Sequence, residues 1–80
     1  MYNKAVSLFN EGKYNESKKL IEIYIKNNIN DNNGYYLLGL IYLRQNNIES
    51  SYQNLNTALI LKVSIRNLFA CADILTRKKL

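Results

Sequence analysis

The sequence predicts an all-α protein built from five antiparallel helices, and three observations support this prediction. Apolar residues recur at intervals of three and four in five stretches of the 80-residue chain, which is typical of amphipathic helices. Polar segments containing asparagine or glycine separate most of these stretches, and the chain contains no proline. The pattern also repeats after 34 residues. We therefore expect helices near residues 2–11, 14–28, 32–45, 48–62 and 65–79.

The first two helices are expected to form a hairpin. Ala5, Leu8 and Phe9 make one apolar stripe, and Gly12 ends the first helix because glycine adopts positive φ without steric cost. On the second helix the buried side contains Ser17, Leu20, Ile21, Tyr24 and Ile25, and the wet side contains Lys19, Glu22 and Lys26.

A second hairpin follows the polar segment at residues 27–33, where Asp31 or Asn30 is the expected cap of the third helix. From Tyr35 to Leu43 this helix is apolar at every position except Gly39. The apolar pattern of the fourth helix contains Ile48, Ser51, Tyr52, Leu55, Ala58 and Leu59.

Ser64 is the expected cap of the fifth helix. Arg77, Lys78 and Lys79 lie in its last turn, where cations interact favourably with the helix dipole.

An offset of 34 residues relates the two hairpins. It pairs Gly12 with Asn46, and asparagine also tolerates the left-handed conformation. Further pairs are Ala5 with Gly39, Ser17 with Ser51, Ile21 with Leu55 and, in the fifth helix, Tyr35 with Phe69. The fifth helix is therefore expected to begin a third repeat.

These residues resemble the tetratricopeptide repeat (TPR), a 34-residue helical hairpin with the pattern W-x2-L-G-x2-Y, then A-x3-F, then P. Leu38, Gly39 and Tyr42 match that pattern, whereas Tyr35, Ser51, Leu55 and Val63 replace its Trp, Ala, Phe and Pro. The resemblance implies an α-solenoid of antiparallel helix hairpins. It would form a single domain over residues 1–80, with repeat one at about 1–31, repeat two at about 32–65 and a capping helix at about 65–79.

The two ends of such a stack are expected to be polar. Lys4, Ser7 and Glu11 would face solvent at the first helix. On the fifth helix, Leu68, Ala72 and Leu75 would contact repeat two, and Asp73 and Thr76 would face outward. The chain would then be a complete capped array. The alternative is that these polar residues are isolated departures from the repeat pattern, without a capping role.

Gly39 is expected to allow close approach of the third and fourth helices near Ser51 and Leu55. Alanine should be tolerated there, because Ala5 occupies the equivalent position, whereas leucine should destabilise the protein.

By resemblance, the first helices of the hairpins line a concave groove, and we expect this groove to bind a protein or peptide partner. The predicted partner-binding residues are Tyr2, Val6, Phe9, Tyr36, Leu40, Leu43 and Ile74, with a basic edge of Arg44, Arg77 and Lys78. Some family members hold an acidic peptide terminus through a clamp of Lys, Asn and Arg. That clamp is absent, since its slots hold Tyr2, Val6, Leu37, Asn67 and Cys71.

Two alternatives remain open for this apolar surface. In the first alternative, the residues of this surface belong to the hydrophobic core, which applies most to Leu40 and Ile74. Otherwise a second copy of the chain covers the surface, in a homodimer or through exchange of the fifth helix, with Ile60 as an additional contact.

The sequence favours a non-enzymatic protein without metal or cofactor. It contains no histidine, its carboxylates are scattered, and it has no nucleotide-binding loop. The single cysteine, Cys71, is expected to be a buried structural thiol. The net charge of +5 is too dispersed to favour nucleic acid. Without a membrane span or a signal-peptide pattern, a cytoplasmic protein is expected.

Overall fold

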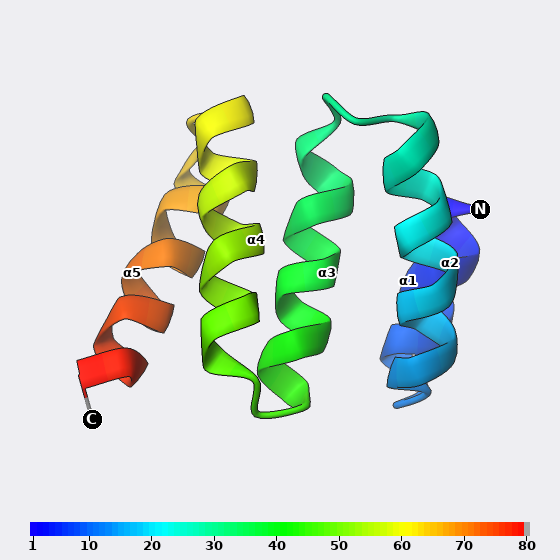
Figure 1. Ribbon diagram of the computed structural model, residues 1–80, viewed down its shortest axis with the longest axis horizontal. Coiled ribbons are helices and arrows are strands. Elements are labelled where there is room, and N and C mark those ends of the chain that lie inside the picture. The colour runs from blue at the N-terminus through cyan, green and yellow to red at the C-terminus, as the bar shows by residue number, and fades with distance from the viewer. Residues whose placement is uncertain (80) are drawn as a thin grey trace.

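The computed structural model describes residues 1–79 and the side chains of residues 1–78. Over these residues the chain is all-helical and contains no strand. Its helices are α1 (Tyr2–Asn10), α2 (Tyr14–Asn27), α3 (Asn32–Arg44), α4 (Ile48–Leu61) and α5 (Ile65–Lys79) (Figure 1). The five-helix prediction is confirmed, and the first four helices each end one residue earlier than expected. No helix in the described part of the chain is long and apolar enough to cross a membrane.

The turns between α1 and α2 and between α3 and α4 have the same construction. Gly12 and Asn46 both adopt positive φ, at 81° and 61°. The amide of Lys13 donates to the carbonyl of Leu8, and the amide of Asn47 donates to the carbonyl of Tyr42, 34 residues further on. The prediction that asparagine replaces glycine in the second turn is therefore confirmed.

Side chains cap three of the helices. The carboxylate of Asp31 accepts from the amide of Asn33 at the start of α3, as predicted. Asn47 caps α4 by accepting from Ser50, and Ser64 accepts from the amide of Asn67 at the start of α5. These bonds pair amides that have no partner within the helix.

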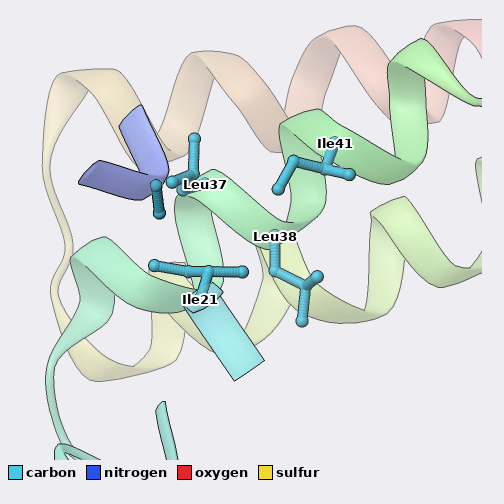
Figure 2. Packing of buried hydrophobic residues seen from close by; sticks show 5 residues of the cluster. Ile21, Leu37, Leu38 and Ile41 are labelled. Carbon is cyan, nitrogen blue, oxygen red and sulfur yellow. The ribbon is translucent and has the colours of Figure 1, made fainter. Parts of the chain in front are cut away.

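Each helix packs on the next along the chain, and α1 also touches α3. In Figure 1, α3 and α4 stand side by side in the middle, with α2 beside α3 and α5 beside α4. One core cluster joins the first three helices through Ala5, Ile21, Leu37, Leu38 and Ile41 (Figure 2). A second cluster of Leu55, Cys71 and Ile74 joins α4 to α5.

In each hairpin, a buried serine forms a hydrogen bond between the two helices. The hydroxyl of Ser17 donates to the carbonyl of Ala5 at 2.6 Å, and that of Ser51 donates to the carbonyl of Gly39 at 2.7 Å. These equivalent bonds hold the small residue of one helix against the next helix. The close approach predicted at Gly39 is therefore confirmed.

The expectation that alanine is tolerated at residue 39 stays a prediction, and the geometry there is tight. A Cβ added to Gly39 would lie 2.6 Å from Cγ and Cδ2 of Leu55, which is buried. In the first hairpin the equivalent pair is Ala5 and Ile21, and both side chains are fully buried. Isoleucine at that position packs beside the methyl group of alanine. At residue 39 the leucine side chain already occupies that space.

The rotation of α5 about its axis also differs from the prediction. Its buried side carries Asn67, Cys71 and Ile74. Leu68, Ala72 and Leu75, which were expected to contact the preceding repeat, are exposed. The exposed side of α5 therefore carries these apolar residues in addition to Asp73 and Thr76, which were expected to face outward.

Asn67 gives the physical reason for this rotation. The Asn67 side chain is fully buried, and its amide nitrogen donates to the carbonyls of Ala58 and Lys62 and to Oδ1 of Asn32. A buried amide needs hydrogen-bond partners, and these partners are available only when Asn67 points at the end of α4. At the other end of the molecule, Lys4, Ser7 and Glu11 are exposed as expected.

Candidate interaction surface

Six of the predicted partner-binding residues are apolar or aromatic side chains of α1 and α3, and we call them the inner face. They are Tyr2, Val6, Phe9, Tyr36, Leu40 and Leu43, and all six are half-buried. The two helices touch each other. The inner face is therefore neither sealed core nor fully exposed surface. Leu40 is therefore only partly a core residue, because its side chain is half-buried.

Ile74 does not belong to this surface. It is fully buried against Leu55 and Cys71, so a partner on the surface cannot contact it. The core alternative was the correct one for this residue, because the rotation of α5 turns Ile74 towards α4.

Two arginines lie over aromatic rings of the inner face. The guanidinium of Arg44 is 5.6 Å from the ring centre of Phe9, and that of Arg66 is 4.0 Å from the ring centre of Tyr36. Each stack joins two helices, α1 to α3 and α3 to α5. Stacking of this kind fixes an arginine without using all its hydrogen-bond donors.

Arg66 is a residue that the sequence prediction missed. Its Nη2 donates to the side-chain oxygens of Asn32 and Asn33, at 2.9 and 3.0 Å. Both of these partners are neutral amides. Arg66 and Asn32 are 34 residues apart, so they occupy the same position in successive repeats. That equivalence was the available sequence signal for their proximity.

The predicted basic edge is only partly free. Arg77 pairs with Asp73 of its own helix at 3.1 Å. Lys78 turns to α4, where it pairs with Glu49 at 3.2 Å and lies over the ring of Tyr52. Lys78 is therefore not an inner-face residue. Within residues 1–78, no carboxylate lies within 4.0 Å of the guanidinium nitrogens of Arg44 or Arg66.

A tyrosine–aspartate pair lies beside the N-terminal end of the inner face. The hydroxyl of Tyr24 donates to Asp31, and this bond, with the amide of Asn33, holds the pKa of Asp31 below its usual value. The same bond raises the pKa of Tyr24. Burial raises the pKa of neighbouring Tyr2. The ring centroids of Tyr2 and Tyr24 are 5.4 Å apart. These groups join the end of α2 to the start of α3.

The remaining titratable groups do not form a chemical centre. Among the described residues, no three His, Cys, Asp or Glu side chains gather in a way that could hold a metal ion. Cys71 is buried, as predicted, and burial raises the pKa of its thiol. A thiol with a raised pKa is a poor nucleophile at neutral pH.

The exposed large apolar side chains concentrate near α5, a feature that the sequence analysis did not predict. They include Ile60, Val63, Ile65, Leu68, Phe69 and Leu75. The sequence signal was present, since residues 65, 68, 72 and 75 follow the 3-4-3 spacing of a helix-packing seam. The TPR resemblance assigned part of this stripe to the interface with repeat two.

Comparisons of the chain with models of protein families, with curated proteins and with solved structures gave no match.

Proposed function

We propose that the protein is a non-enzymatic interaction module of TPR-like architecture, which binds an apolar or amphipathic peptide segment on its inner face. The 34-residue recurrence of turns and buried serine bonds supports the architecture. Gly12 and Asn46 both have positive φ, and Ser17 and Ser51 each donate to a backbone carbonyl of the preceding helix. A solenoid of such hairpins presents an extended surface to partners.

The pair of stacked arginines is the observation that carries this proposal. Arg44 and Arg66 each cover an aromatic ring of the inner face, and neither guanidinium forms an ion pair within 4.0 Å with a carboxylate of residues 1–78. Leu40 and Leu43 precede Arg44 on α3 and are half-buried. A partner that places apolar anchors on the leucines and a carboxylate on an arginine satisfies both features.

The test is selection of peptides from a random library on the immobilised protein, followed by affinity measurement. We expect the selected peptides to combine apolar residues at helical spacing with Asp or Glu. Arg44→Glu should weaken their binding by about tenfold or more, because it places like charges together. Lys26→Glu is the matched control, since it makes the same charge change on an exposed part of α2.

The apolar anchors require a second variant. Tyr36→Ala combined with Leu43→Ala should remove a contact typically worth about 2 kcal/mol or more of binding free energy. Both side chains also support the second core cluster, so thermal melting must show that the double variant remains folded. Unchanged binding in the folded double variant and in Arg44→Glu would exclude the inner face as the site.

A further inference from the structure

A hollow of about 240 Å³ lies between the start of α3 and the turn that joins α4 to α5. These two segments lie at the same end of the molecule (Figure 1). We call it the α3–α5 hollow, and its lining residues are Asn32, Asn33, Lys62, Ser64 and Arg66. Two of the five are cationic and none is acidic. A water molecule takes about 30 Å³ in the liquid, so the hollow has room for a polyatomic ion.

Arg66 determines which atoms of the two asparagines remain free. An arginine side chain has hydrogen-bond donors only, so it turns the side-chain oxygens of Asn32 and Asn33 towards its Nη2, at 2.9 and 3.0 Å. The two side-chain nitrogens are left as donors, and neither has an acceptor among residues 1–78. Each asparagine therefore contributes an unused donor to the lining.

The other lining residues also retain unused donors. The guanidinium of Arg66 bonds through Nη2 and Nε, so its Nη1 has no acceptor in residues 1–78. The hydroxyl of Ser64 accepts from the amide of Asn67, which leaves its proton free. The ammonium of Lys62 forms no ion pair in this part of the chain. All five lining residues therefore offer a donor, which suits an oxyanion.

The hollow carries a net positive charge. Lys62 and Arg66 supply two charges, and Asp31 is the acidic residue next to the lining in the chain. The carboxylate of Asp31 is held by the hydroxyl of Tyr24 and the amide of Asn33. These two bonds are the main causes of its lowered pKa, and the charge of Arg66 adds to them. Asp31 therefore offsets part of the positive charge without occupying the free donors.

The repeat architecture does not require these two cations. Lys62 and Arg66 correspond at the 34-residue offset to Asn28 and Asn32. Asn28 donates to the carbonyl of Tyr24 at the end of α2, and Asn32 accepts from Asn67. The earlier junction between hairpins is thus built from neutral side chains, so packing alone does not account for the cations in the later one.

We propose that the α3–α5 hollow binds a phosphate group. A phosphate monoester carries about −1.5 to −2 charges at pH 7 and has three acceptor oxygens. It can satisfy both cations and several of the neutral donors, whereas a carboxylate has a single charge and two oxygens. Binding in this hollow does not require a partner on the inner face.

The probe for this proposal is inorganic phosphate, added to the isotope-labelled full chain at pH 7 and followed by NMR. We expect saturable shifts at the amides of residues 32–33 and 62–66, with a dissociation constant in the millimolar range. Acetate should bind about tenfold or more weaker, because it carries a single charge. Chloride at the same ionic strength is the control for screening.

A second probe, O-phosphoserine, distinguishes the source of the phosphate group. Binding tighter than that of inorganic phosphate would support the proposal and identify a phosphate carried by an organic molecule. Weaker but saturable binding at the same residues would support it and identify the free ion as the ligand.

Lys62→Gln should weaken phosphate binding by about tenfold, because one of the two cations is lost. The Lys62 side chain is exposed, so the fold should survive. Lys26→Gln removes the same charge from an exposed part of α2 and should leave phosphate binding unchanged. Arg66→Gln should also weaken binding, and thermal melting must show that this variant is folded, since Arg66 stacks on Tyr36.

Three results would overturn the proposal. These are equal binding of phosphate and acetate, shifts that never saturate, and phosphate binding that is unchanged in Lys62→Gln and in folded Arg66→Gln. Arg44→Glu should leave phosphate binding unchanged, and Lys62→Gln should leave peptide binding on the inner face unchanged. Failure here and failure of the inner-face proposal can therefore be distinguished.

Discussion

Gly39 and Leu55 show how a single residue sets the distance between two helices. Gly39 lacks the side chain that would meet Leu55, and the carbonyl of Gly39 accepts a hydrogen bond from Ser51. Glycine inside a helix costs about 1 kcal/mol relative to alanine. Close contact with α4 offsets that cost.

We expect Gly39→Ala to lower the free energy of unfolding. Crowding against a buried leucine costs about 1–3 kcal/mol, and the gain in helix propensity of about 1 kcal/mol offsets only part of it. Adding Leu55→Ile should restore stability, since Ala5 and Ile21 form that combination in the first hairpin. Urea unfolding of both single variants and the double variant gives the coupling energy. Additive effects would contradict the proposed contact.

The bond between Asp31 and Tyr24 should make the free energy of unfolding decrease at acidic pH. The pKa of Asp31 is lowered in the folded state, first by the Tyr24 hydroxyl and then by the amide of Asn33. An unfolded chain therefore binds the proton more readily. The stabilisation is present above about pH 4 and is lost as the pH falls through the lowered pKa.

Tyr24→Phe removes the largest cause of this shift. The pKa of Asp31 should rise towards its usual value, and the melting temperature should fall less steeply on acidification from about pH 5. NMR titration of the carboxylate and melts over this pH range measure both effects. Tyr35→Phe is the control, because Tyr35 donates to the carbonyl of Ile29 and not to a carboxylate. Equal acid dependence in the two variants would contradict the assignment to Tyr24.

At the scale of elements, Asn67 determines how α5 is attached. Its side-chain amide joins the last turn of α4, the start of α3 and α5 itself. The apolar contribution to this attachment is limited to Cys71, Ile74 and their partly buried neighbours. Polar bonds therefore set the rotation of the helix, and apolar contacts then fill the space beneath it.

Asn67→Ala should lower the free energy of unfolding by about 1–3 kcal/mol, because buried groups lose their partners. Asn67→Asp should cost more near neutral pH, since carboxylate oxygens would face the carbonyls of Ala58 and Lys62. Thermal melts of both variants provide the measurement. Asn32→Ala removes just one bond to Asn67 and should have a smaller effect. An Asn67→Asp protein as stable as the wild type would show that this network does not hold α5.

At the scale of the whole molecule, α3 organises the packing and α5 carries the bare surface. Contacts from α1, α2 and α4 reach α3, whereas α5 packs mainly on α4. The exposed apolar side chains of α5 include Leu68, Phe69 and Leu75. A partner on Leu40 and Arg44 need not touch Leu68 and Leu75.

The sequence by itself determined the local features of this protein. Five helices, positive φ at Gly12 and Asn46, the Asp31 cap, the burial of Ser17 and the close approach of Gly39 to Ser51 were all predicted correctly. Each depends on residue types close in the chain, or on a pair held in one hairpin, and such preferences are readable without a tertiary structure.

Only the tertiary structure decided how α5 turns about its axis. The helix has an apolar stripe through Leu68, Ala72 and Leu75 and another through Cys71 and Ile74, so periodicity permits either side to be buried. The bonds of Asn67 to residues of α3 and α4 select the second stripe. That choice buries Ile74, turns Lys78 to Glu49, places Arg66 over Tyr36 and leaves Leu68, Ala72 and Leu75 exposed. These outcomes depend on contacts between distant segments, which no local pattern encodes.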